Sequence, residues 1–243
     1  MSEKQGDKTA VVKNPIQVIL VVLLLVSAFF NGAMWMKVKM LESSFGKAAE
    51  GSRAAVQPTP TTEIKVDPIN DNDHIRGDRS ARIALIEYSD LECPFCKQFH
   101  KTAQRVVDEY DGQVMWVYRH FPLDSLHSKA DKEAEAAECA GDKFWEMTDK
   151  IYEVTPSNNG LNLDDLPKLA KAVGIDQNKF QECLDGGKFA SHVEDDYQSG
   201  IRAGVTGTPG NILLDTKTGK TRIIPGAVPF EQIKPAIDAM LAS

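Results

Sequence analysis

The chain has 243 residues and a formal net charge of −7, with 42% hydrophobic and 26% charged residues. That length fits one or two domains, and the composition excludes collagen, disulfide-dense miniproteins and wholesale disorder. The acidic balance argues against a nucleic-acid-binding surface, which needs clustered Lys and Arg. The charge is unevenly divided, because residues 1–61 have seven basic and four acidic side chains whereas residues 62–243 have 21 and 31. Two different kinds of segment therefore make up the chain.

An uncharged, apolar run extends over residues 16–36. At about 1.5 Å rise per residue, it is long enough to cross the hydrocarbon core of a bilayer. Trp35 lies at one end, where its amphipathic ring suits the membrane interface. A buried helix of a soluble domain rarely stays apolar on every face over such a length. We therefore expect a transmembrane signal-anchor helix over residues 16–36, preceded by a cytoplasmic tail over residues 1–15.

The alternative for this segment is a cleaved signal peptide, because Val26-Ser27-Ala28 is a tolerable cleavage site after a basic leader. The apolar run continues well past Ala28, which favours an uncleaved anchor. Basic residues flank both ends of the run, so the positive-inside rule does not decide the orientation. Residues 37–62 follow as a linker, whose Pro and Thr residues favour an extended, solvated backbone.

A cysteine pair lies between a predicted strand and a predicted helix. Residues 82–88 form a short apolar run rich in strand-formers, and the motif Cys93-Pro94-Phe95-Cys96 follows. Apolar side chains then recur with helical spacing up to Tyr110, and residues 114–118 read as a second buried strand. The order predicts a βαβ unit with the two thiols at the helix N-terminus.

This placement suits thiol chemistry. Only the thiolate attacks a disulfide, and a free thiol is mostly protonated at neutral pH. The unpaired backbone N–H groups and the dipole at a helix N-terminus stabilise negative charge. We expect Cys93, the more exposed of the pair, to be the nucleophile. Cys96 lies one turn further on, close enough to resolve a mixed disulfide or to close a ring with Cys93.

Three other interpretations of the motif are weaker. Haem attachment requires a His after the second Cys, where this chain has Lys97. A zinc site needs a second close pair of ligands, and the remaining cysteines, Cys139 and Cys183, are far apart in sequence. A purely structural disulfide between Cys93 and Cys96 stays open. We expect no metal site and no cofactor in this protein.

With its other motifs the sequence resembles the DsbA-like thiol:disulfide oxidoreductases of the thioredoxin fold. The resemblance spans about residues 63–243. It rests on the motif at residues 93–96, on Val205-Thr206-Gly207-Thr208-Pro209, on a helical spacer over residues 123–204, and on Gly226–Phe230 with the amphipathic helix that follows. The implied fold is an α/β thioredoxin domain with an inserted helical domain, in which Gly226–Phe230 corresponds to the last strand and the amphipathic helix after it to the last helix.

The resemblance also implies roles for single residues. The Thr208-Pro209 loop corresponds to the family's cis-proline loop, which lies against the cysteines and presents backbone groups to a substrate peptide. Glu87, an acid within an apolar strand, corresponds to a buried acid that assists proton transfer at the second cysteine. The alternative for Glu87 is a structural ion pair with a neighbour such as Arg119.

The dipeptide between the cysteines departs from the strongly oxidising members of the family, which have Pro-His. Phe95 supplies no positive charge, and the adjacent Glu92 opposes a thiolate at Cys93. Both features predict less stabilisation of the reduced form than in those members.

Helical patterns occupy residues 127–154 with a break near Gly141, then about residues 163–173 and 176–184. Cys139 and Cys183 lie in the first and third of these, and we expect them to form a structural disulfide; two buried reduced thiols are the alternative. His100, His120 and His127 are expected at the surface or at helix caps rather than as ligands.

The expected protein is an extracytoplasmic, membrane-anchored enzyme that oxidises cysteine pairs in secreted or envelope proteins and is reoxidised by a membrane redox partner. A disulfide-permissive compartment places the tail inside and the domain outside. The rivals are a reductase or isomerase that uses the same two cysteines, and a non-catalytic peptide-binding module.

Overall fold

The structure is a computed structural model, and it describes residues 64–243. The tail, the transmembrane helix and the linker predicted over residues 1–62 lie outside the described residues. Among residues 64–243, no helix is both long and apolar enough to cross a membrane.

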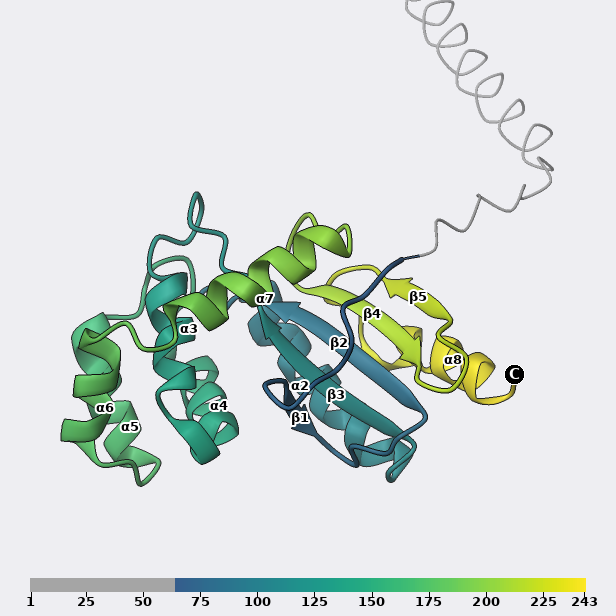
Figure 1. Cartoon of the computed structure of the whole chain (residues 1–243), viewed down its shortest axis with the longest axis horizontal. Coiled ribbons are helices and arrows are strands. Elements are labelled where there is room, and N and C mark those ends of the chain that lie inside the picture. Colours follow the sequence, from purple (N-terminus) through teal and green to yellow (C-terminus); the bar gives the residue numbers. More distant parts are fainter. Residues whose placement is uncertain (1–63) are drawn as a thin grey trace, which may run out of the picture. The chain divides into compact units, whose positions relative to one another are not determined.

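The described residues form a mixed sheet of five strands, in the order β1-β3-β2-β4-β5 (Figure 1). The central pair β2·β3 is parallel, and the pairs β1·β3, β2·β4 and β4·β5 are antiparallel. The strands are β1 (His74–Arg76), β2 (Ile83–Ser89), β3 (Val114–His120), β4 (Gly210–Asp215) and β5 (Thr221–Ile224).

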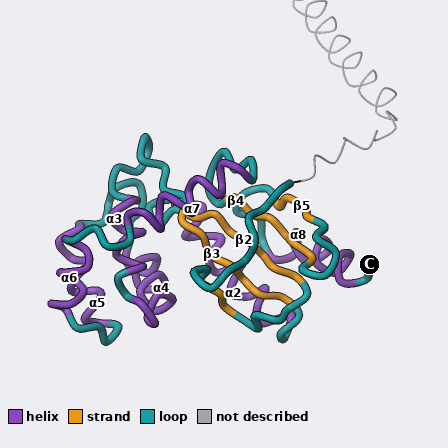
Figure 2. Tube along the Cα trace, viewed as in Figure 1, coloured by secondary structure: helices purple, strands orange, loops and turns teal. Residues whose placement is uncertain are grey.

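Seven α-helices and two short 3-10 helices accompany the sheet in the described part of the chain, and Figure 2 shows how they flank the strands. The α-helices are α2 (Pro94–Tyr110), α3 (Ala130–Glu138), α4 (Phe144–Val154), α5 (Leu166–Ala172), α6 (Gln177–Asp185), α7 (Ala190–Arg202) and α8 (Phe230–Leu241). The 3-10 helices are η1 (Gly141–Lys143) and η2 (Leu163–Asp165).

Strands β2 and β3 are buried on both faces, as their nearly continuous apolar sequences predict. On one face, Leu85 and Trp116 belong to a core shared with α2, α8 and helices of the insert. On the other face, Ile86 and Val117 belong to a second core, which includes Val205. The sheet is therefore the middle layer of an α/β fold.

Helices α3–α6 form a helical module inserted between β3 and β4, at the left of Figure 1. Helix α7 leads from this module back to the sheet and packs against β3 and β2. Gly200 permits that packing, because a Cβ atom there would lie 2.5 Å from the ring of Phe121 and 2.9 Å from that of Tyr88. The insert predicted over residues 123–204 therefore ends in α7, a helix that packs against the sheet.

One predicted strand is wrong. Gly226–Phe230 was expected to contain the last strand, but the last strand is β5, which ends at Ile224, and Phe230 begins α8. Gly226 has a positive φ of 53°, and Pro225 and Pro229 have no N–H to donate to a strand ladder. This segment therefore forms the loop between β5 and α8.

Candidate active site

Cys93 is the N-cap residue of α2, with extended backbone angles, and Pro94 is the first residue of the helix. The missing N–H of proline costs nothing there. Cys93 has no side-chain cap of its own, but its carbonyl accepts the first helical hydrogen bond from Lys97 N–H at 3.0 Å. Both thiols lie at the start of the helix, where the sequence pattern predicts them.

The two thiols have opposite acidities. The pKa of Cys93 is lowered from 9.0 to about 6, chiefly by a hydrogen bond from Cys96, with further help from Thr208 and from the backbone N–H groups of Cys96 and Phe95. These N–H groups are the unpaired donors of the helix N-terminus. Phe95 therefore assists the thiolate through its backbone although its ring has no charge. Glu92 is not among the main contributors to this shift.

Cys96 is completely buried, and burial together with the neighbouring Cys93 raises the pKa of its thiol well above 9.0. The backbone N–H of Asp90 lies 3.5 Å from its Sγ atom. In the dithiol form, the pair at neutral pH therefore consists of a reactive thiolate at Cys93 and a protonated thiol at Cys96.

The predicted substrate loop lies against Cys93. The Thr208-Pro209 peptide bond is cis, and the carbonyl oxygen of Thr208 lies 3.6 Å from the Sγ atom of Cys93. Beside the loop is a cavity of about 220 Å³. Its walls include Val205, Pro209, Ile212, Ile223 and Pro225.

Glu87 is completely buried in β2 and does not pair with Arg119. Its Oε1 atom accepts a 2.7 Å hydrogen bond from Ser89, and its Oε2 atom has no partner among the described residues. Burial raises the pKa of Glu87 to about 8, against the effect of its hydrogen bonds. Arg119 instead contacts Asp73 at 2.7 Å, so the structural ion pair considered for Glu87 is wrong.

The charge of Glu87 interacts with that of both cysteines and contributes to the raised pKa of Cys96. A buried acid with a pKa of about 8 is mostly protonated at neutral pH, so it can give a proton and then take one back. The arrangement thus suits proton exchange with the buried thiol.

Asp90 is a second buried acid near the cysteines, after Glu87, and it was not predicted from the sequence. Asp90 is almost completely buried and accepts hydrogen bonds from the N–H groups of Glu92 at 2.8 Å and Leu123 at 2.9 Å. It also lies 2.8 Å from Nδ1 of His127. Burial disfavours the charged imidazole, but Asp90 outweighs burial and, with the charge of Cys93, raises the pKa of His127. The only sequence signal was an acid directly after a buried strand.

Glu92 and Glu133 are also completely buried, one beside Cys93 and the other in α3. Burial and the neighbouring Glu92 raise the pKa of Glu133 to about 10, so Glu133 is protonated at neutral pH. The carboxyl oxygens of both residues have no hydrogen-bond partner among the described residues. The sequence shows Glu92 as a charge beside Cys93, but it does not show that Glu133 of the helical module lies near it.

The histidines differ from expectation. His100, His120 and His127 were predicted at the surface or at helix caps, but all three are buried. Each contacts a carboxylate: His100 lies 2.6 Å from Asp149, His120 lies 2.9 Å from Glu138, and His127 lies 2.8 Å from Asp90. Burial of an imidazole requires such a partner, and the partners come from distant parts of the chain.

Cys139 and Cys183 are joined by a disulfide that links the end of α3 to α6, across 44 residues. It lies within the helical module and uses neither cysteine of the motif. The structure therefore has the four cysteines as two separate pairs.

Comparisons with known proteins agree with this geometry. A family model described as thioredoxin matches residues 69–239. The crystal structure of DsbA2 from Pseudomonas aeruginosa is similar with a TM-score of 0.61 and 31% identity, over 72% of this chain and 97% of that one. The oxidised BdbD structure from Bacillus subtilis has a TM-score of 0.63 and 23% identity, over 74% of this chain and 99% of that one, which supports the fold.

Among curated proteins, the Na(+)/H(+) antiporter NhaA 3 of Salinispora tropica is 35% identical over 148 residues. This match covers 60% of the present chain but only 22% of the antiporter, so the chain spans about a fifth of that relative's length. The chain has two thiols at the start of a helix and a loop carbonyl that faces the first thiol. Together with these similarities, this geometry shows that the chain belongs to the thioredoxin family, among the DsbA-like thiol–disulfide oxidoreductases.

Proposed function

We propose that this oxidoreductase is a membrane-anchored, extracytoplasmic oxidase that introduces disulfides into secreted or envelope proteins. The observation that carries the proposal is the acidity of Cys93, whose pKa is about 6. A stabilised thiolate lowers the free energy of the reduced enzyme relative to its disulfide. The enzyme disulfide is therefore a good electron acceptor, which favours oxidation of substrates over their reduction.

The reaction follows from the two acidities. A substrate thiolate attacks Sγ of Cys93 in the Cys93–Cys96 disulfide, which forms a mixed disulfide and releases the sulfur of Cys96. Glu87, in its acid form, supplies the proton that the buried Cys96 thiolate needs. A second substrate thiolate then attacks the substrate sulfur, which forms the substrate disulfide and releases Cys93 as a thiolate. The substrate loses two electrons, and the enzyme gains them as the reduced cysteine pair.

The substrate chain is expected to lie along the Thr208-Pro209 loop, with the backbone of Thr208 next to the reacting sulfur. The neighbouring cavity and the exposed ring of Phe95, which is 61% accessible, offer apolar surface for substrate side chains. Such surface suits chains that have not yet buried their own apolar residues.

Location is proposed from the sequence. The apolar run over residues 16–36 would anchor the enzyme, and the linker over residues 37–62 would separate the domain from the bilayer. The disulfide between Cys139 and Cys183 supports an oxidising compartment. A membrane redox partner would return the Cys93–Cys96 pair to the disulfide after each turnover.

The decisive experiment is the redox state of Cys93 and Cys96 in cells, trapped with acid, alkylated with a mass-tagged maleimide and resolved as a gel shift. A mostly oxidised pair supports the oxidase, and a mostly reduced pair indicates a reductase or isomerase. Cys93→Ser should abolish oxidation of a model dithiol peptide by the purified chain. If Cys93→Ala/Cys96→Ala complements a deletion strain as well as wild type does, the protein acts instead as a binding module.

A further inference from the structure

We propose that His74, Glu138 and His192 form a binding site for a divalent transition-metal ion of the zinc type, separate from the cysteine motif. One potential ligand atom from each of these residues lies within 4.8 Å of those of the other two. The residues come from β1, from the last position of α3 and from α7. Their convergence thus depends on the fold and not on local sequence.

The distances suit a small ion. Nε2 of His74 lies 2.8 Å from Oε1 of Glu138, and Nε2 of His192 lies 3.6 Å from the same oxygen. Zinc bonds of about 2.0–2.1 Å in a tetrahedral site place ligand atoms about 3.3 Å apart. The two measured distances bracket this value. Small rotations of the side chains would therefore bring all three ligand atoms to bonding distance from one ion.

The donor set selects the class of ion. Two imidazole nitrogens and one carboxylate oxygen are zinc ligands, with a fourth position left for water. Calcium and magnesium prefer oxygen ligands throughout, so two nitrogens disfavour them. Thiolates are absent from the cluster, which separates it chemically from Cys93 and Cys96.

Two of the three ligands, His74 and Glu138, are held by neighbours. The ring of His74 stacks on that of Phe144, with centroids 3.4 Å apart and planes 1° from parallel. His120 is buried and its Nε2 lies 2.9 Å from Oε1 of Glu138. Asp196, one helical turn further along α7, lies 4.0 Å from Nε2 of His192, so its carboxylate faces the proposed site and does not orient the imidazole. Orienting contacts such as those of His74 and Glu138 are typical of metal sites.

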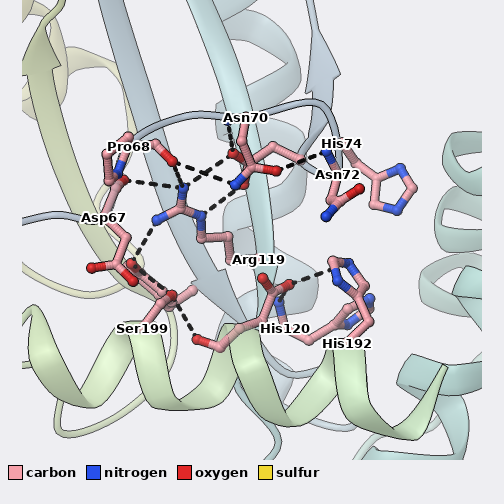
Figure 3. Close-up of polar contacts among 12 residues, drawn as sticks. Asp67, Pro68, Asn70, Asn72, His74, Arg119, His120, His192 and Ser199 are labelled. Atoms are coloured by element: carbon pink, nitrogen blue, oxygen red, sulfur yellow. Dashed lines mark hydrogen bonds and ion pairs between the residues drawn. The ribbon is translucent and has the colours of Figure 1, made fainter.

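The cluster is open to solvent on one side, since His74 and His192 are each 22% exposed whereas Glu138 is 4% exposed. His192 also lines a polar cavity of about 240 Å³, whose walls include Asp73, Asp195 and Asp196. Figure 3 shows the polar network around Arg119, with His74, His120 and His192 on one side of it. Arg119 and Arg202 also line this cavity, but each is paired with a carboxylate, Asp73 and Asp67 respectively. Asp195 and Asp196 are the further acidic groups along the approach of a cation to His192.

An ion at this position would join the sheet to the helical module. His74 belongs to the short edge strand β1, and Glu138 precedes Cys139, whose disulfide fixes the end of α3. Because a ligand that binds the folded state stabilises it by mass action, zinc should raise the thermal midpoint. The stabilisation should depend on the three ligands and not on the redox motif.

The test is a zinc titration of the full chain, without a polyhistidine tag, in detergent and after removal of metal with a chelator. The Cys93–Cys96 pair is first oxidised, so that its thiolates cannot bind zinc. We expect one zinc ion per chain and a raised thermal midpoint. His74→Ala and His192→Ala should each weaken binding about tenfold or more and remove the thermal shift.

His192→Ala is the main variant, because its side chain is partly exposed on α7 and circular dichroism can verify that the variant folds. His100→Gln is the matched control, since it removes a histidine from a different carboxylate pair and should bind zinc as wild type does. Cobalt added in place of zinc should give visible bands of a tetrahedral ion without a thiolate charge-transfer band. The proposal is overturned if the oxidised wild type does not bind zinc, if His192→Ala binds it equally well, or if only calcium raises the midpoint.

Discussion

The carbonyl oxygen of Thr208 lies 3.6 Å from Sγ of Cys93, although 115 residues separate the two in sequence. The contact closes the active site between the start of α2 and the loop before β4. The hydroxyl of Thr208 has no hydrogen-bond partner among the described residues, and it lies close enough to Cys93 to help lower the pKa of that thiol by donating to the thiolate. The acidity of the thiol is therefore a property of two segments and not of the cysteine motif alone.

Replacement of Thr208 by Val, which has nearly the same shape but no hydroxyl, should raise the pKa of Cys93. Loss of one hydrogen bond to a charged group predicts an increase of about one unit. The measurement is the pH dependence of iodoacetamide alkylation of the reduced enzyme. Cys96 stays protonated over this range and does not interfere, because its own pKa is well above 9.0. An unchanged midpoint near pH 6 would exclude a contribution from the hydroxyl.

Phe95→His should make Cys93 still more acidic. The side chain at residue 95 is exposed at the start of α2, so a protonated imidazole there would add positive charge near the thiolate. A decrease of one pKa unit corresponds to about 1.4 kcal/mol, or about 30 mV in the reduction potential. Equilibration with glutathione buffers measures the potential, and Phe95→Gln controls for the loss of the aromatic ring. A potential equal to that of the Gln variant would contradict the prediction.

Glu87→Gln should change how stability depends on pH. Burial raises the pKa of Glu87 from 4.5 to about 8, so between these values the folded protein retains a proton that the unfolded chain releases. Stability contributed by this proton is present below pH 4.5 and is lost as pH rises through about 8. The free energy of unfolding of the variant relative to wild type should therefore increase from pH 5 to pH 8, by up to about 4 kcal/mol.

Urea unfolding of both proteins in their oxidised forms provides the measurement, since the Cys93–Cys96 thiols then do not titrate. Gln retains an oxygen that can accept the hydrogen bond from Ser89. If the two pH profiles run parallel, Glu87 is not the buried acid that the structure indicates.

Removal of the disulfide in the helical module should cost stability without abolishing the chemistry. Cys139→Ser/Cys183→Ser opens a loop of 44 residues, for which the chain-entropy model predicts a loss of about 4 kcal/mol. Urea unfolding measures this loss, and oxidation of a dithiol peptide at low temperature should persist because Cys93 and Cys96 are unaltered. A loss of peptide oxidation in a variant that remains folded would show that the module contributes directly to catalysis.

The sequence predicts those parts of the structure that depend on local patterns. The strand before Cys93, the helix after it and the strand at residues 114–118 each follow from a run of apolar residues or from helical spacing. Strand β1 has only three residues and was not predicted, because its pairing with β3 comes from the fold.

The partners of buried polar groups could not be predicted either. His74 and Glu138 are 64 residues apart, and Asp90 and His127 are 37 residues apart. Nothing in a single sequence indicates which distant carboxylate meets which imidazole. The error at Gly226–Phe230 has a different origin, because the last strand of the family was assigned to residues whose glycine, Pro229 and preceding Pro225 favour a loop.

The close packing at Gly200 has a mechanical consequence. Helix α7 is pressed against Phe121 and Tyr88 at that residue, and the carbonyl of Gly200 accepts a 2.9 Å hydrogen bond from Val205 N–H, at the start of the substrate loop. Because α7 and the loop before β4 are joined at this residue, a displacement of α7 would also displace the Thr208 carbonyl that faces Cys93.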